Sequence, residues 1–138
     1  MNSEDRVIHK DLLVWQRAML LAESIYRITR SFPSEERFGL VSQMRRAAVS
    51  IPSNIAEGAA RRTSAEYLSF LHIARGSLAE LETQLTLSGR LNLLKISESL
   101  GDDVDRIGQL LNALIAVIRK RRDRFRSDES RIPSPESR

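Results

Sequence analysis

The sequence contains no cysteine and only two histidines, His9 and His72, among its 138 residues. The absence of cysteine excludes disulfide bonds, thiolate metal sites and cysteine nucleophiles. The two histidines lie far apart in the sequence, and neither belongs to a set of histidines and carboxylates with metal-ligand spacing. The sequence also lacks a phosphate-binding glycine-rich loop and a nucleophile elbow. We therefore expect a non-enzymatic protein with no cofactor and no metal.

Long apolar runs are missing as well. No segment approaches the roughly 18 consecutive apolar residues that a membrane-spanning helix needs. Residues 1–11 are polar and mixed in charge, unlike a secretory signal peptide. These absences, together with the lack of cysteine, predict a soluble protein of the cytoplasm that does not enter a membrane.

Basic residues exceed acidic ones by 22 to 18, and the whole excess lies at one end of the chain. Residues 119–138 contain eight basic and four acidic residues, so residues 1–118 are neutral in sum. Arginine outnumbers lysine 19 to 3. Guanidinium groups bind phosphate with two parallel hydrogen bonds, which favours a nucleic-acid partner. A genome rich in G and C gives the same bias, and the sequence does not decide between the two explanations.

Apolar residues recur every three or four positions in four segments, which is typical of amphipathic helices. The segments are 12 to about 32, 34 or 35 to about 58, 63–89, and one that begins between 97 and 103 and reaches 126. Short loops join them, which predicts an all-α protein, an up-down-up-down antiparallel four-helix bundle. We expect the bundle over residues 11–126, a flexible N-terminus over 1–10 and a disordered polar tail over 127–138.

Local signals mark several helix ends and one interruption. Asp11 is a candidate N-cap of the first helix, and Thr63 followed by Glu66 fits a capping box. Gly89 is a candidate for the residue that follows the third helix. Pro52 lies inside the second apolar stripe, where a proline lacks an amide donor and collides with the preceding turn. We expect a kink or a break of the helix there.

The helices have wider apolar faces than a single bundle contact needs. The predicted stripe of the first helix comprises Trp15, Ala18, Met19, Ala22, Ile25, Tyr26 and Thr29. Further apolar residues lie outside the stripes: Leu13, Leu20, Leu21, Ile28 and Phe32 in the first helix, and Leu110, Ala113 and Val117 in the fourth. Monomers rarely expose large apolar patches, so the excess predicts either a deep core or an oligomer, such as a closed ring or a dimer.

Basic residues form two candidate nucleic-acid-binding groups. Residues 37–62 carry five arginines against Glu57, whereas residues 77–105 carry an excess of carboxylates. Ordinary solvated helix faces and cations at a helix end explain the same pattern, so both interpretations stay open. Phe125 is the one aromatic residue in the basic run 119–126, which favours phosphate attraction over base readout. The candidates are Arg37, Arg45, Arg46, Arg61, Arg62, Arg119, Lys120, Arg121, Arg122, Arg124 and Arg126.

Five segments together resemble a known family. They are LLVWQRA (12–18), FP (32–33), ERFGL (36–40), QMRRAAVSIPSNIAEG (43–58) and FLHIARGSLAEL (70–81). The pattern is similar to the 23S rRNA-intervening sequence proteins over about residues 10–120, and residues 50–58 are its most specific part. Ser50, Ser53 and Asn54 surround Pro52, where their side chains can donate hydrogen bonds to carbonyls that the proline leaves unpaired. We interpret this segment as a structural kink and packing seam.

The resemblance implies properties that the spacing of residues does not show. Members are small helical bundles, and the known ones assemble as ring-shaped homopentamers. A related branch comprises the accessory proteins of diversity-generating retroelements, which bind a reverse transcriptase and nucleic acid through basic surfaces. No catalytic residue is carried over. The sequence therefore predicts an oligomer that binds RNA or DNA, with an alternative as a protein-interaction scaffold or accessory factor for a nucleic-acid enzyme such as a reverse transcriptase.

Overall fold

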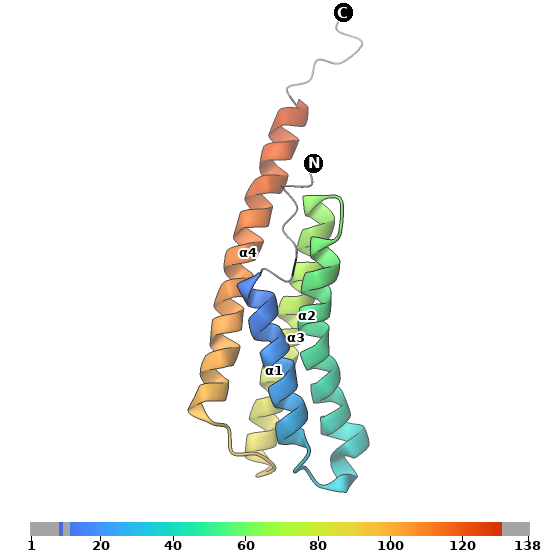
Figure 1. Ribbon diagram of the computed structural model, residues 1–138, viewed down its shortest axis with the longest axis vertical. Helices are drawn as coiled ribbons and strands as arrows, with labels where there is room; N and C mark the ends of the chain where they lie inside the picture. Colours follow the sequence, from blue (N-terminus) through green and yellow to red (C-terminus); the bar gives the residue numbers. More distant parts are fainter. Residues whose placement is uncertain (1–8, 10–11, 131–138) are drawn as a thin grey trace, which may run out of the picture.

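A computed structural model describes His9 and residues 12–130, and this part of the chain is a helical bundle without a strand (Figure 1). The helices are α1 (Leu13–Thr29), α2 (Ser42–Ala59), α3 (Ser64–Arg90) and α4 (Glu98–Ser130). A 3-10 turn, η3 (Ser34–Glu36), and a π turn, η4 (Arg37–Val41), precede α2. Successive helices run in opposite directions, so the predicted antiparallel four-helix bundle is confirmed.

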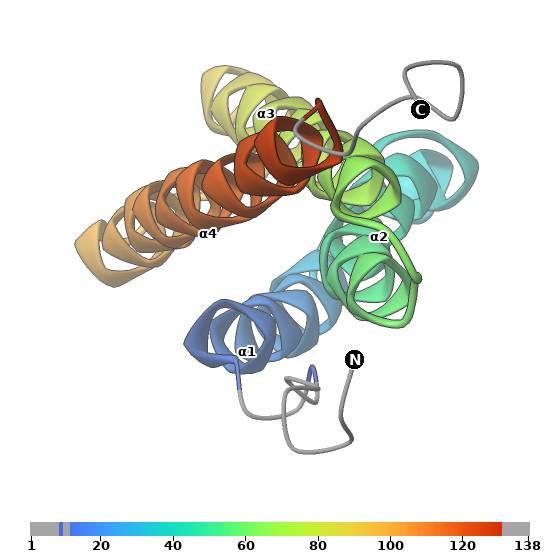
Figure 2. The ribbon, with the colours of Figure 1, turned by 90° about the horizontal axis from the view of Figure 1, so that it is seen from above.

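Helices that are consecutive in the sequence are also neighbours in space. Seen from above, α2 lies between α1 and α3, and α4 packs on α3 and α1 (Figure 2). The most extensive contact is that between α2 and α3. All four helices contribute to one core, whose fully buried side chains include Ile25, Met44, Ile51, Leu71 and Leu111.

The apolar stripe of α1 is rotated from the predicted one. Val14 and Leu21 are buried, whereas Met19 and Tyr26, which the prediction placed in the core, are about two-fifths exposed, at 38% and 43%. Because apolar residues surround much of α1, spacing alone did not decide which of them face the core. Met19 and Tyr26 therefore form a solvent-exposed apolar strip on α1, beside α2.

The helix interruption falls at Gly39 and not at Pro52. α2 continues through Pro52, which is buried, while Gly39, inside η4, has non-helical backbone angles (φ −103°, ψ −111°). Near the proline, the Asn54 side-chain amide donates to the Ser50 carbonyl at 2.8 Å. The Ser50 hydroxyl lies 2.8 Å from the hydroxyl of Ser77. The contact between Ser50 and Ser77 therefore links α2 to α3. Because α2 is continuous through Pro52, the predicted break of the helix there is wrong.

Gly58 allows α2 and α3 to approach each other closely. A Cβ atom added at this position would lie 2.9 Å from the Phe70 Cβ and 3.0 Å from the Tyr67 ring. α2 ends at Ala59, one residue later, so the predicted end region is confirmed. The position needs a glycine because of this contact between helices.

Two predicted helix starts are confirmed by side-chain caps. The Thr63 hydroxyl accepts from the Glu66 amide at 3.2 Å, and the Ser97 hydroxyl accepts from the Leu100 amide at 3.1 Å. At the first helix, the N-cap residue is Leu12, which makes no side-chain cap bond, and the predicted cap Asp11 lies outside the described residues.

The end of α3 differs from the prediction. The helix runs past Gly89 to Arg90, and Asn92 adopts the left-handed conformation (φ 58°). The Leu93 amide donates to the Ser88 carbonyl at 2.9 Å, and the Asn92 amide donates to the Gly89 carbonyl at 3.1 Å. This pair of bonds is a Schellman motif, in which asparagine takes the place of the more frequent glycine.

α4 extends beyond the rest of the bundle. It continues to Ser130, four residues past the boundary at 126 that the sequence suggested, and its last turns project past the start of α3 (Figure 1). Residues 131–138 of the predicted tail and residues 1–8 of the predicted flexible N-terminus lie outside the described residues. The projecting end carries the cations of residues 119–126.

Candidate nucleic-acid interface

The bundle separates the candidate basic residues into two sets at opposite ends. Arg61 and Arg62 lie in the turn between α2 and α3, at the end where α4 projects (Figure 1). Arg37 lies in η4, and Arg45 and Arg46 lie in the first half of α2, toward the other end. The remaining candidates join the first set because they occupy the C-terminal part of α4: Arg119, Lys120, Arg121, Arg122, Arg124 and Arg126.

Arg45 is engaged inside the bundle. Its Nε donates to the Thr29 hydroxyl at 3.0 Å, and its guanidinium carbon lies 4.6 Å from the centre of the Tyr26 ring. Thr29 is buried and itself donates to the Ile25 carbonyl at 2.6 Å. The half-buried Arg45 thus joins α2 to α1, and its position suits a structural role better than phosphate binding.

Two other candidates have partners within their own region. Arg61 forms an ion pair with Glu57 at 3.0 Å and lies 4.7 Å from the centre of the Phe70 ring. Arg37 lies 5.5 Å from the centre of the Phe38 ring, which is 88% exposed. Both guanidinium groups remain at the surface and keep free donors.

The C-terminal part of α4 is a dense, exposed group of cations. Residues 119–126 contain six basic residues and Asp123. Within the described residues, Asp123 pairs with Arg122 at 3.1 Å, one of two ion pairs found there. The half-buried Tyr67 lies near enough for Arg121 to act on its hydroxyl, whose pKa is raised by burial and lowered to a lesser extent by that cation. The basic surface of α4 therefore reaches the start of α3, where Tyr67 lies.

Three residues of this face, Arg75, Asn112 and His72, are not among the candidates that the sequence suggested. Arg75 of α3 donates to the Asn112 Oδ1 of α4 at 3.3 Å and to the His72 Nδ1 at 3.0 Å. The pKa of His72 is lowered by partial desolvation and then by the charges of Arg75, Arg119 and Arg122. A signal was present in the sequence, because residues 67–79 and 106–122 contain no Asp or Glu.

Carboxylates gather at the opposite end of α4. Glu98, Asp102, Asp103 and Asp105 occupy its first turns, beside the end of α3 (Figure 1). The charges are therefore separated along α4 itself, and not between residues 37–62 and 77–105 as the sequence suggested. This separation does not divide the whole bundle, because Arg37, Arg45 and Arg46 lie toward the acidic end on a different element.

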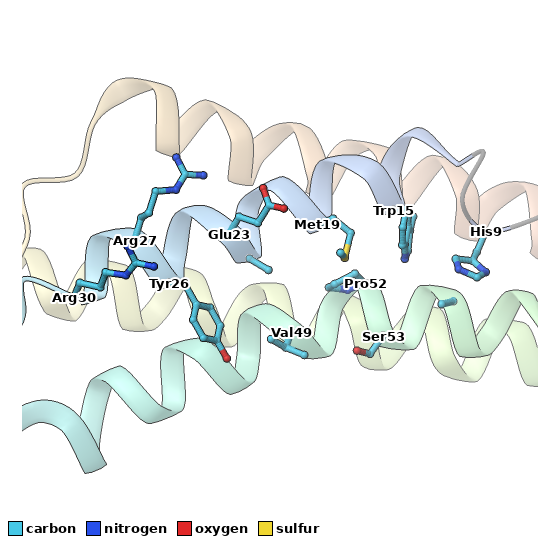
Figure 3. Close-up of a pocket in the computed structure, with 12 residues that line it drawn as sticks. His9, Trp15, Met19, Glu23, Tyr26, Arg27, Arg30, Val49, Pro52 and Ser53 are labelled. Atoms are coloured by element: carbon cyan, nitrogen blue, oxygen red, sulfur yellow. The ribbon is translucent and has the colours of Figure 1, made fainter.

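A groove between α1 and α2 forms the second prominent surface. It has a volume of about 700 Å³, and Trp15, Met19 and Tyr26 of α1 face Val49 and Pro52 of α2 across it (Figure 3). The His9 ring packs edge-on against Trp15, with 5.2 Å between the ring centres. Charged residues border the groove: Glu23, Arg27 and Arg30. A mainly apolar groove with a charged border suits a protein partner.

The described residues hold no group of three or more histidine or acidic side chains arranged to bind a metal ion. Over the same part of the chain, none of the helices combines the length and apolar character needed to cross a membrane. The geometry thus defines a helical bundle with one strongly basic end and one apolar groove.

Comparisons with known proteins agree with this architecture. The sequence profile of the 23S rRNA-intervening sequence proteins matches residues 10–113, and the chain belongs to this family. A solved protein of unknown function, described as from the S23 ribosomal protein family of Bacteroides thetaiotaomicron VPI-5482, has a TM-score of 0.70 and 27% identity. The match covers 78% of this chain and 98% of that one. No functionally curated protein matches significantly. Neither matching comparison indicates a class of enzyme.

Proposed function

We propose that the protein is a non-enzymatic, homo-oligomeric module of the cytoplasm that binds RNA or DNA through its basic surfaces. The observation that carries the proposal is the C-terminal part of α4, where exposed cations project past the bundle. Cations arranged along a helix attract the phosphate backbone and release its counterions. The exposed Arg62 in the adjacent turn extends the same surface. Backbone attraction of this kind requires no base-specific contact.

A salt titration tests nucleic-acid binding. Structured RNA and duplex DNA are titrated with the protein over a series of salt concentrations, and the slope of log affinity against log salt is measured. We expect a steep loss of affinity with salt, with a slope of about −0.9 for each phosphate neutralised on a duplex. Absence of binding to either nucleic acid at low salt would overturn the proposal.

A charge-matched pair of variants locates the binding surface. Replacing Lys120, Arg124 and Arg126 by glutamine removes three exposed cations from the projecting end of α4. The control replaces three exposed arginines elsewhere, Arg17, Arg90 and Arg106, and has the same net charge. We expect a shallower salt slope and weaker binding for the first variant alone. Equal losses in both would indicate an effect of total charge and would contradict the assignment of this surface.

The apolar groove supports the homo-oligomer. Monomers seldom leave such a surface open, and Leu13, Leu20 and Val117 are also about half exposed on α1 and α4. Exposed apolar residues both in the groove and outside it suit a ring, in which each copy contacts two neighbours through different faces. The family resemblance implies five copies.

Light scattering tests the assembly. We expect about five times the chain mass of 15.7 kDa, and a monomer would contradict the proposal. Val49→Glu places a charge in the groove and is expected to reduce the mass. Leu87→Glu, at another exposed apolar position, is the matched control. Equal masses for Val49→Glu and the unmodified chain would exclude the groove as a contact between copies.

A second candidate function is supported by the same groove. A scaffold for a nucleic-acid enzyme, such as a reverse transcriptase, would bind that enzyme through the apolar surface between α1 and α2. Capture of such an enzyme by the chain after nuclease treatment, and its loss with Val49→Glu, would favour this function. Loss of the partner on nuclease treatment alone would favour a nucleic-acid bridge instead.

A further inference from the structure

The face shared by α3 and α4 brings together residues that are distant in the sequence. Arg75 and Asn112 meet at 3.3 Å, and Gly108 lies opposite Leu78, so the two helices are held in a defined antiparallel register. Arg119 and Arg122 follow on α4, about one turn apart and about two and three turns beyond Asn112. This register places both cations near His72, as their effect on its pKa indicates.

Arg75 is oriented by its neighbours before any ligand is present. Two of the five guanidinium donors are used, one toward Asn112 Oδ1 and one toward His72 Nδ1. A guanidinium has no acceptor, so His72 Nδ1 accepts in this contact and the ring proton lies on Nε2. Arg75 keeps three donors and His72 keeps one. All of them belong to exposed side chains, and they are donors of the type that bind a phosphate group.

Most of the charge on this face has no acidic partner within the described part of the chain. Among its cations, Arg122 has a carboxylate partner there, Asp123, which contacts its Nε and leaves the terminal nitrogens available. The facing stretches of α3 and α4, residues 67–79 and 106–122, contain no acidic residue. A bound anion would therefore relieve repulsion among Arg75, Arg119 and Arg122, in addition to accepting their hydrogen bonds.

We propose that His72, Arg75, Arg119 and Arg122 form a binding site for a backbone phosphodiester group of a nucleic acid. The inference rests on the proposed function, and it assigns the contact to a side face of the bundle as well as to its projecting end. Arg75 positions the site because it is held on both sides, and Arg119 and Arg122 supply charge from α4. Phosphate contacts of this kind fix the orientation of a nucleic acid without reading its sequence.

Binding experiments with paired variants test the site. Arg75→Gln combined with Arg119→Gln removes two cations from the face, and Arg90→Gln combined with Arg106→Gln is the control with the same net charge. With a short RNA hairpin as the probe, we expect about a tenfold or greater loss of affinity for the first variant. We also expect its salt slope to be reduced by about one. Thermal unfolding checks that both variants fold.

The second readout is the titration of His72 observed by proton NMR. The RNA hairpin is expected to raise the pKa of His72, because a phosphate near the ring stabilises the imidazolium. The groups facing this ring are Arg75 on its own helix and Arg119 and Arg122 on α4.

The outcomes separate the site from the proposed function. If the unmodified protein binds the hairpin but the Arg75/Arg119 variant binds equally well with the same salt slope, the site is wrong while nucleic-acid binding stands. An unchanged His72 titration at saturating RNA would also overturn the site. If the unmodified protein binds no nucleic acid at low salt, both proposals fail together.

Discussion

The guanidinium of Arg45 lies 4.6 Å from the centre of the Tyr26 ring and hydrogen-bonds to Thr29, so a residue that the sequence suggested for phosphate binding connects two helices instead. Arg46, the next residue, is exposed. The two adjacent arginines of α2 therefore differ in their contacts, and their substitution should affect the stability of the fold differently.

Arg45→Gln is expected to lower the free energy of unfolding by about 1–2 kcal/mol, because the contacts to Tyr26 and Thr29 are lost together. Arg45→Lys keeps the charge but not the planar fork, and most of the loss should remain. Urea unfolding measures the effect. Arg46→Gln is the matched control, with an expected change within about 0.5 kcal/mol. A similar loss for Arg46→Gln would contradict the structural role of Arg45.

Gly58→Ala is expected to destabilise the fold by about 1–3 kcal/mol, despite the better helix propensity of alanine. The new Cβ atom would lie 2.9 Å from the Phe70 Cβ, and the two helix backbones cannot separate without loosening the core. Gly76→Ala on α3 is the control, because an added Cβ meets nothing within 4 Å. That variant should be stabilised by about 0.5–1 kcal/mol. Thermal melts that shift in the same direction for both would refute the assignment.

The hydroxyl pair Ser50–Ser77 is expected to show energetic coupling across the α2–α3 interface. A double-mutant cycle with Ser50→Ala and Ser77→Ala should give a coupling free energy of about 0.5–1.5 kcal/mol. The control cycle combines Ser53→Ala, in place of Ser50→Ala, with Ser77→Ala. Ser53 is a suitable control because its side chain is exposed. Additive losses in the Ser50–Ser77 cycle would mean that the 2.8 Å contact contributes nothing measurable.

The stability of the protein should fall as the pH is lowered through the usual titration range of histidine. The pKa of His72 is below its ordinary value of 6.5 in the folded chain, so the unfolded chain binds a proton that the folded chain binds less readily. Melting temperatures between about pH 7.5 and pH 5.5 measure this dependence. His72→Gln should make it shallower, and high salt should weaken it by screening the arginines. An identical pH dependence for the unmodified chain and His72→Gln would contradict the assignment.

Local sequence signals predicted much of the fold. The hydroxyls of Thr63 and Ser97 each accept from the backbone amide three residues later. These helix starts therefore depend on the local sequence and not on distant residues. The buried face of α1 did not follow from spacing, since Met19 and Leu21 are both apolar and packing against the other helices selects between them. Pro52 was expected to interrupt its helix, yet core contacts and the Asn54–Ser50 bond accompany a continuous α2.

The candidate site was predictable only in part. The cations of residues 119–126 stand out because they are adjacent in the sequence. Arg75 and His72 were not recognised, because their importance depends on the register that places α3 beside α4. The role of Arg45 depended in the same way on its distance from Tyr26, which no spacing within α2 reveals.

The distribution of charge along α4 also gives the molecule a long-range orientation. Its acidic first turns and basic last turns are separated by about 30 Å, and their charges are opposite in sign to the two ends of the backbone dipole, which they offset. A polyanion diffusing toward the protein will therefore feel a torque before it touches the surface, and the basic end will turn toward it. The charges of α4 thus bias the direction from which a polyanion approaches, before any contact with the surface forms.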